Sequence, residues 1–242
     1  MIVLHGGPGA PGHMAPVALG LADTFRVLEP FERASGAEPL TVSLHIADLH
    51  ALILERLPGE LPALVGSSWG AMLALAYAAA HPETAGPLVL IGCGTFDLAA
   101  RARLRAILEE RKSGAVYSYD PVTDDDGTDA FDERGHHETW NDMLRLQSEG
   151  VYPAAFAAIR SPVLMLHGAF DPHPGRMIRA SLEPYLPRLE YREWERCGHY
   201  PWLERSVREE FFDVLREWLR IRGRFRAATV RERSSLTRYP AS

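Results

Sequence analysis

Residues 62–75 read Pro-Ala-Leu-Val-Gly-Ser-Ser-Trp-Gly-Ala-Met-Leu-Ala-Leu. The apolar run Ala63–Val65 is typical of a buried strand, and the Ala- and Leu-rich run Ser68–His81 is typical of a helix. Between them lies a Gly-x-Ser-x-Gly pattern centred on Ser68. A serine at such a strand-to-helix turn adopts a strained backbone, so the residues two positions to either side must be small. The stretch therefore predicts a nucleophile elbow that presents Ser68 at the C-terminal edge of a sheet, the alternative being a plain glycine turn with a surface serine.

Working outward from this turn, short apolar runs alternate with stretches of helical periodicity, and no repeat of 20 to 50 residues is present. The strand-like runs are Ile2–Leu4, Phe25–Leu28, Ala63–Val65, Leu88–Ile91, Val163–Leu166 and Leu189–Trp194. The helical stretches are Thr41–Leu57, Ser68–His81, Gly175–Leu186 and Leu203–Ile221. Such alternation predicts an α/β fold with a mostly parallel sheet of about six strands flanked by helices.

The alternation is interrupted once, between Phe96 and Ile159. Two helix-like segments, Leu98–Lys112 and Thr139–Glu149, flank an acidic loop there, whose aspartate spacing does not follow the EF-hand pattern. We interpret the loop as a solvated turn and the whole insertion as a small helical cap. The expected organisation is a core formed by residues 1–96 and 160–221, a cap at 97–159 and a basic C-terminal tail at 222–242.

Composition places the chain among globular proteins, because 46% of its 242 residues are hydrophobic and 24% are charged. The net charge is −6. Residues 222–242 hold six arginines and one acid, a charge of +5, so residues 1–221 carry −11, a balance that favours cationic over anionic substrates. The tail is interpreted as a disordered extension, with nucleic acid or an acidic partner as the alternative. For the whole chain, no nucleic-acid partner is expected.

Cysteine usage and the chain's start suggest an intracellular setting. Cys93 and Cys197 are too few for a disulfide framework and are expected to be reduced thiols. The N-terminal residues lack the basic region and apolar run of a signal peptide. The longest stretch of low charge, residues 61–80, is broken by proline and glycine, so no membrane span is expected. The predicted location is the cytoplasm.

Two further motifs supply an acid and a base. Asp171 lies in Leu-His-Gly-Ala-Phe-Asp-Pro at 166–172, and His199 lies in Arg-Cys-Gly-His-Tyr-Pro at 196–201, each just past a strand-like run. Because the C-terminal ends of parallel strands meet at one edge of a sheet, both are expected beside Ser68. Serine, acid and histidine in this chain order predict a catalytic triad. Taken singly, Asp171 is explained equally by a turn, and His199 by a surface loop.

A glycine-rich loop, His5-Gly6-Gly7-Pro8-Gly9, follows the first strand-like run. We expect the backbone N–H of Gly7 and that of Trp69, the residue after Ser68, to form a two-donor oxyanion hole. The alternative is an ordinary Gly/Pro turn.

These motifs resemble those of the α/β-hydrolase family, and within it the branch of prolyl iminopeptidases and related esterases, whose oxyanion loop also reads HGGPG and whose elbow carries Ser-Trp-Gly. The resemblance extends from Ile2 to about Leu219 and is weakest in the cap. It implies an α/β-hydrolase fold with Ser68, Asp171 and His199 as the triad and no cofactor.

Two stretches depart from the family pattern. Family members carry Tyr-Asp-x-Arg-Gly-x-Gly after their next strand, whereas residues 28–36 keep only Arg33 and Gly36 of it. Members also have two strands ahead of the HGGPG strand, while this chain begins at Met1, directly before its first strand-like run. The resemblance therefore predicts about six strands in place of the family's eight.

The substrate-binding residues are expected in and near the cap. Prolyl iminopeptidases are expected to bind the free amino group of the substrate through acidic cap residues, because a buried ammonium needs a charge partner. The candidates are Glu138, close to Trp140, and Glu149, with exposed helix charges as the alternative. His173 and Trp202 flank the triad residues and are predicted to line the pocket.

The sequence thus predicts a serine hydrolase that cleaves a small ester or a short peptide through an acyl-enzyme. An esterase and an iminopeptidase-like aminopeptidase both remain open. The alternative from another class is a non-catalytic ligand-sensing module on the same fold. A dehalogenase is excluded because it needs an aspartate at the position of Ser68. No histidine pattern indicates a metal site, and no metal or organic cofactor is expected.

Overall fold

The computed structural model describes residues 1–111, 116–123, 131–223 and 237–239, and shows a single parallel sheet in the order β6-β5-β4-β3-β1-β2-β7. The strands are β1 (Ile2–Leu4), β2 (Leu28–Pro30), β3 (Leu64–Ser67), β4 (Leu88–Ile91), β5 (Val163–Gly168), β6 (Leu189–Trp194) and β7 (Thr237–Tyr239). The predicted α/β class and largely parallel sheet are confirmed.

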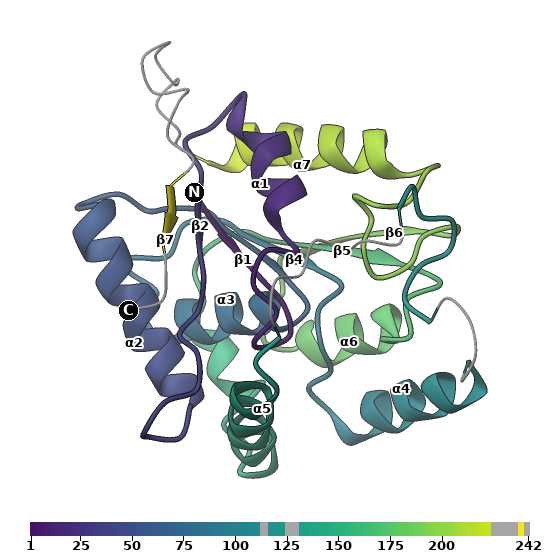
Figure 1. Cartoon of the computed structure of the whole chain (residues 1–242), viewed down its shortest axis with the longest axis horizontal. Helices are drawn as coiled ribbons and strands as arrows, with labels where there is room; N and C mark the ends of the chain where they lie inside the picture. Colours follow the sequence, from purple (N-terminus) through teal and green to yellow (C-terminus); the bar gives the residue numbers. More distant parts are fainter. Residues whose placement is uncertain (112–115, 124–130, 224–236, 240–242) are drawn as a thin grey trace.

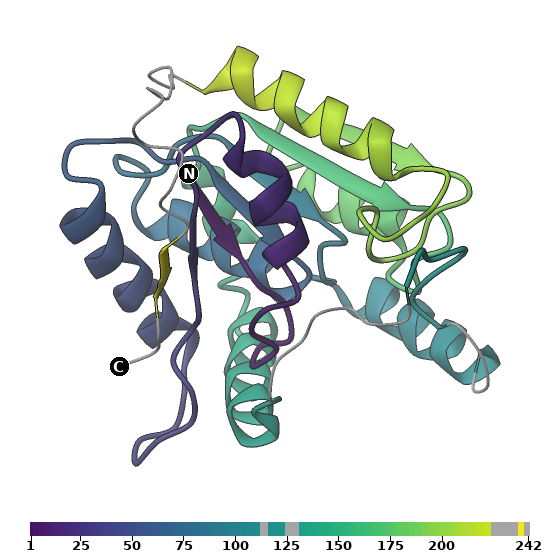
Figure 2. The same ribbon diagram turned by 45° about the horizontal axis from the view of Figure 1, so that its top comes forward.

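Helices cover both faces of this sheet, as parallel strands joined by crossovers require. Figures 1 and 2 show α1 and α7 together on one face, α2, α3 and α6 on the other, and α4 and α5 at the periphery away from α1 and α7. The helices are α1 (Ala15–Ala22), α2 (Val42–Arg56), α3 (Trp69–Ala80), α4 (Leu98–Glu110), α5 (Glu133–Ser148), α6 (Gly175–Leu182) and α7 (Arg208–Arg222), with a 3₁₀ turn η1 (Ala154–Ala158). No helix of these described residues is long and apolar enough to cross a membrane.

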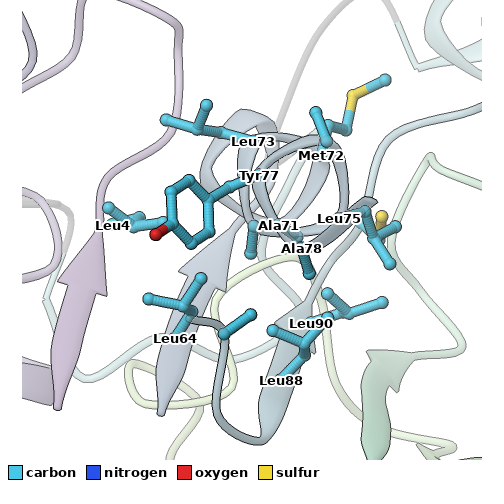
Figure 3. Close-up of a cluster of buried hydrophobic side chains, with 14 of the residues drawn as sticks. Leu4, Leu64, Ala71, Met72, Leu73, Leu75, Tyr77, Ala78, Leu88 and Leu90 are labelled. Carbon is cyan, nitrogen blue, oxygen red and sulfur yellow. The ribbon is translucent and has the colours of Figure 1, made fainter. Parts of the chain in front are cut away.

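Helix α3 is the centre of the larger hydrophobic cluster. Every residue from Trp69 to Ala78 is buried, because the helix packs on the sheet and is covered on its outer side by α2 and η1. Figure 3 shows its Ala71 and Ala78 directed at Leu64 and Leu88 of the sheet, with Leu73 and Tyr77 on a neighbouring face. Such burial requires a helix whose residues are apolar on every face. This packing holds the N-terminus of α3 rigidly at the sheet edge.

Strands β1, β4 and β6 have the predicted bounds, whereas β2 starts three residues late. Phe25 and Val27 are buried in the cluster under α1 and α7 but lie outside the ladder, so burial alone made them resemble a strand. Helix α1 was not predicted, because Gly20 interrupts its pattern and no side chain caps its N-terminus.

The segment between β4 and β5, predicted as a cap, contains α4, α5 and η1. Helix α4 begins at Leu98 and is capped by Asp97, whose Oδ1 accepts a hydrogen bond from Ala100 N at 2.8 Å. Helix α5 begins six residues before the predicted Thr139, because Asp132 caps it by accepting from Gly135 N.

The six predicted strands are β1 to β6, and the C-terminal segment adds β7 alongside β2, with Tyr239 opposite Pro30. This extra strand was not expected from the sequence. The remainder of the predicted tail, residues 224–236 and 240–242, lies outside the described residues, as do residues 124–130 of the acidic loop.

Candidate active site

The turn between β3 and α3 has the geometry of a nucleophile elbow. Ser68 has φ 54° and is the only residue other than glycine with positive φ among the described residues. Its backbone N–H donates to Ile91 O at the end of β4 (2.8 Å), and its side chain is partly exposed. A Cβ on Gly66 would overlap the carbonyl of Gly70, so strand and helix approach as closely as glycine allows. The turn therefore has the backbone geometry expected for Ser68, whose role as a nucleophile stays a prediction.

Asp171 and His199 meet directly at the same sheet edge. Asp171 follows β5, His199 follows β6, and His199 Nδ1 lies 2.6 Å from Asp171 Oδ2, with both side chains buried. The imidazole packs against Gly92, the residue after Ile91 of β4, where a Cβ would come within 2.7 Å of Nδ1. Through the hydrogen bond of its N–H to Ile91 O, Ser68 lies beside the same end of β4. Among the described residues, Ser68 Oγ makes no hydrogen bond to His199.

Asp171 is shared by three histidines. Besides His199, it lies 2.9 Å from His173 Nδ1 through Oδ1 and 3.2 Å from His167 Nε2 through Oδ2. Burial alone would raise the pKa of the Asp171 carboxyl, but His199, His173 and His167 hold it well below its usual value. The acid is therefore ionised, as it must be to orient an imidazole and stabilise its protonated form.

His173 lies beside both the acid and the base. Its ring stacks on that of His199, with centroids 4.7 Å apart, and its Nδ1 is bonded to Asp171. It also lines a pocket together with Asp171, and its contact with a substrate stays a prediction. Ligand atoms of Asp171, His173 and His199 lie within 4.8 Å of one another, close enough to share a cation. A cation there would displace both imidazole–carboxylate bonds.

The glycine-rich loop lies against the elbow. A Cβ on Gly6 would come within 3.1 Å of Ser68 Cβ, and Gly7 has φ 114°. His5 is buried and accepts a hydrogen bond from Glu32 N at Nε2 (3.0 Å), so its Nδ1 carries the proton and donates to Gly6 O (2.9 Å). Burial lowers the pKa of His5 to about 4, which keeps this ring neutral at pH 7. The loop is thereby fixed in one conformation beside Ser68.

The cap holds this loop from its other side through α5. Trp140 Nε1 donates to Gly7 O at 3.1 Å, and His136 Nδ1 lies 3.0 Å from Pro8 O. Just before α5, Asp132 N donates to Gly9 O at 3.0 Å. The ring of Trp140 also lies edge-on to Trp69, with centroids 6.2 Å apart. Trp140 is therefore in contact with the loop of the expected oxyanion hole, and its part in substrate binding stays a prediction.

Replacing Trp140 with phenylalanine is expected to reduce kcat/KM about tenfold, because the loop loses the donor that fixes Gly7 while the aromatic ring remains. Kinetics on a chromogenic ester measure the effect. Trp218→Phe is the matched control, since Trp218 lies in the cluster under α1 and α7 and its Nε1 has no hydrogen-bond partner among the described residues. Equal kcat/KM in the two variants would contradict a positioning role for Trp140.

Three other predicted pocket residues make contacts within the protein. Glu138 accepts from Leu40 N (2.8 Å) and from the guanidinium of a neighbouring arginine on α5, so it joins α5 to the start of α2. Glu149 is exposed at the end of α5 and pairs with Arg145. Trp202 is buried in the core against Phe211. These contacts give each residue a structural role, and a part for them in substrate binding stays a prediction.

Glu204 is a supporting residue that the sequence did not reveal. Its fully buried carboxylate accepts from Tyr119 N (2.7 Å) and Gly198 N (2.8 Å) through Oε1, and from Asp120 N (2.8 Å) through Oε2. His199 N also donates to Tyr117 O, at 2.6 Å. The loop that carries His199 is thus bonded to residues 117–120 of the cap. Nothing in the local sequence marks Glu204, because its cap partners lie more than 80 residues away.

Glu204→Gln is expected to destabilise the fold by about 2 kcal/mol, because an amide NH₂ would face a backbone N–H that now donates to a carboxylate. Urea unfolding measures the loss. Glu217→Gln on the exposed side of α7 is the control and should change stability by less than about 0.5 kcal/mol. A Glu204→Gln protein as stable as this control would show that the three hydrogen bonds contribute little.

Comparison with known proteins decides the family. The model of the alpha/beta hydrolase family matches residues 1–214. The chain belongs to the alpha/beta hydrolase family. The family resemblance drawn from the HGGPG loop and the Ser-Trp-Gly elbow is thereby confirmed.

The relatives of this alpha/beta hydrolase are hydrolases with several substrates. The 2-hydroxymuconate semialdehyde hydrolase of Pseudomonas sp. (strain CF600) is 27% identical over 234 residues, covering 86% of this chain and 83% of the relative. The proline iminopeptidase of Neisseria gonorrhoeae is 38% identical over 101 residues, but that match covers 38% of this chain and 32% of the relative. These similarities support hydrolase activity.

Solved structures agree on the fold. The serine hydrolase CarC, involved in carbazole degradation, superposes with a TM-score of 0.69 at 21% identity, covering 91% of both chains. An esterase from Thermogutta terrifontis gives 0.65 at 20% identity, covering 91% of this chain and 89% of that one.

Proposed function

We propose that the protein is a serine hydrolase in which Ser68 attacks an acyl carbon, His199 acts as general base and acid, and Asp171 orients His199. The observation that supports this most is the strained Ser68, presented at the sheet edge where His199 and Asp171 are hydrogen-bonded at 2.6 Å. A strained backbone at a serine is retained only where the surrounding structure enforces it, and such strain clusters at functional sites.

The chemistry follows from which atoms are engaged. Because His199 Nδ1 is bonded to Asp171, Nε2 is the nitrogen left to take the proton of Ser68 as Oγ bonds to the carbonyl carbon. The oxyanion is stabilised by the N–H groups of Gly7 and Trp69. His199 then returns the proton to the leaving group as the acyl bond breaks. Water repeats the sequence on the acyl-enzyme, which releases the acid and restores Ser68.

The contacts of Glu138 and Glu149 favour one class of substrate over another. In prolyl iminopeptidases the substrate's ammonium is expected to meet acidic cap residues, yet Glu138 and Glu149 here are bound to arginine or backbone partners. We therefore propose a small ester or a related neutral acyl compound as substrate ahead of an N-terminal proline amide. A second candidate is a semialdehyde of the kind named for the Pseudomonas relative, because that match spans most of both chains whereas the iminopeptidase match does not.

A labelling experiment combined with a substrate panel tests the proposal. A fluorophosphonate probe should modify the wild-type protein at Ser68, as mass spectrometry of its peptides would show. The panel compares p-nitrophenyl butyrate, proline p-nitroanilide and 2-hydroxymuconate semialdehyde. Of the ester and the anilide, the ester is expected to give the higher kcat/KM. Absence of both labelling and turnover would instead favour the non-catalytic ligand-sensing module.

A further inference from the structure

A pocket outside the proposed triad lies between α2, α3 and the loop after β2. Its volume is about 170 Å³, and neither Ser68 nor His199 lines it. Most of its wall is apolar, formed by Leu4, Pro30, Phe31, Leu49, Leu52 and Leu73. The site is therefore distinct from the proposed hydrolytic centre, although both border the start of α3.

Glu32 supplies a buried carboxylate to this pocket. Its side chain is only 7% exposed, and its Oε2 accepts a hydrogen bond from Trp69 Nε1 at 2.7 Å. Oε1 is buried and has no hydrogen-bond partner within the part of the chain that the structure describes. A buried carboxylate oxygen without a donor is costly, so Glu32, as a lining residue of the pocket, is poised to turn this oxygen toward a donor from a ligand.

His45 does not neutralise this carboxylate. It is 2% exposed, its Nδ1 lies 3.5 Å from Glu32 Oε2, and its Nε2 is 3.0 Å from Thr139 Oγ1 of the cap. Burial lowers the pKa of His45, with Glu32 opposing, so the ring is neutral at pH 7. Burial also raises the pKa of Glu32 to about 7, against the effects of His45 and Trp69. A proton on the carboxylate, or a ligand that brings a hydrogen-bond donor, would therefore give Glu32 Oε1 the partner that it lacks.

The remaining charges around the pocket favour a cation. At the mouth, Arg33 is bonded to Asp48 of α2 through two hydrogen bonds, so these two groups offset each other. Glu55 of α2 also lines the pocket, but it is exposed and pairs with Arg56, whose Nε lies 3.2 Å from Glu55 Oε1. His5 lies on the sheet side, where it accepts from Glu32 N and is neutral. The negative charge left to a ligand is therefore that of Glu32.

We propose that this pocket binds a small organic ammonium ion, a primary amine on a short apolar chain, whose nitrogen donates to Glu32 Oε1. The apolar chain would lie against Leu49, Leu52 and Leu73, which removes its surface from water. A metal ion fits this site poorly because the other two carboxylates of the lining are already paired, Asp48 with Arg33 and Glu55 with Arg56, which leaves Glu32 alone. An anion is disfavoured by Glu32.

Calorimetric titration with butylammonium chloride tests the proposal. We expect saturable binding to the wild-type protein at pH 8, at least tenfold weaker binding to Glu32→Gln, and little binding of the neutral analogue 1-butanol. Glu55→Gln, which changes an exposed acid at the mouth, is the matched control and should bind within about twofold of wild type. Equal affinity of wild type and Glu32→Gln, or binding of 1-butanol as tight as butylammonium, would overturn the proposal.

The pH dependence has a defined sign. Glu32 with a pKa of about 7 is mostly ionised at pH 8 and mostly protonated at pH 6, while an alkylammonium stays charged at both. Affinity should therefore fall about tenfold from pH 8 to pH 6 in the wild type, and should not change in Glu32→Gln. An affinity that rises toward pH 6 would contradict Glu32 as the partner.

Two further variants distinguish this pocket from the hydrolytic centre. Ala51→Trp places a bulky side chain at the exposed mouth of the pocket, so it should abolish binding without lowering the unfolding midpoint, even if Glu32→Gln folds poorly. Ser68→Ala should bind butylammonium like wild type, whether or not the protein proves to be a hydrolase. Binding that survives in Ala51→Trp, or that is lost after fluorophosphonate labelling, would place the ammonium elsewhere and refute this pocket.

Discussion

Ser68→Ala should lower the turnover of p-nitrophenyl butyrate by about 10⁴- to 10⁶-fold, to the rate left by binding and oxyanion stabilisation alone. Serine and alanine share the Cβ, and both bear the cost of φ 54° equally, so the elbow keeps its conformation. The free energy of unfolding should therefore stay within about 0.5 kcal/mol of wild type. Steady-state kinetics and urea unfolding measure the two quantities on the same preparation.

The neighbouring serine is the matched control. Ser67 is fully buried at the end of β3, and its Oγ has no hydrogen-bond partner among the described residues. Ser67→Ala removes the same hydroxyl one position earlier and should leave turnover within about threefold of wild type. If Ser68→Ala kept more than one hundredth of the activity while Ser67→Ala lost it, Ser68 could not be the nucleophile.

Gly66→Ala is expected to destabilise the protein by about 3 kcal/mol or more, a large effect for the addition of a single methyl group. The new Cβ would occupy the space of the Gly70 carbonyl and press on the N–H of Ala71. Those atoms are backbone, so no side-chain rotation relieves the overlap, and strand β3 must separate from α3. Activity should fall too, because that separation moves Ser68. Urea unfolding measures the loss.

Gly36→Ala provides the comparison. Gly36 lies in the exposed loop after β2, and a Cβ there meets no atom within 4 Å. This substitution should change stability by less than about 0.5 kcal/mol. A Gly66→Ala protein that unfolds at the same urea concentration as Gly36→Ala would show that the elbow tolerates a wider separation of strand and helix than the structure implies.

Where burial and periodicity coincide, the fold was predictable from the sequence. Strands β1, β4 and β6 are short runs whose pattern leaves one assignment, and α3 follows from an Ala- and Leu-rich run after the elbow. Helix α1 lacked a capping side chain and contained Gly20, so local preference spoke against it. Strand β7 depends on pairing with β2, more than 200 residues earlier, and no local pattern encodes such a pairing.

The candidate site, like the fold, was predictable from the sequence only in part. Ser68, Asp171 and His199 each follow a strand, and the rule that parallel strands end at one edge places them together. The contacts of Glu138 and Trp202 could not be predicted, because their partners, Leu40 and Phe211, come from other elements of the fold. Which acids are free and which are engaged is a property of tertiary contacts, and a single sequence does not encode it locally.

The hydrogen bonds around Glu204 couple the position of His199 to that of residues 117–120. Because His199 N donates to Tyr117 O, and Glu204 accepts from both Tyr119 N and Gly198 N, the backbone of His199 cannot shift without these residues. A displacement of residues 117–120 would therefore lengthen the 2.6 Å contact between His199 Nδ1 and Asp171 Oδ2. The alignment of the proposed base thus depends on a segment that lies about 80 residues earlier in the chain.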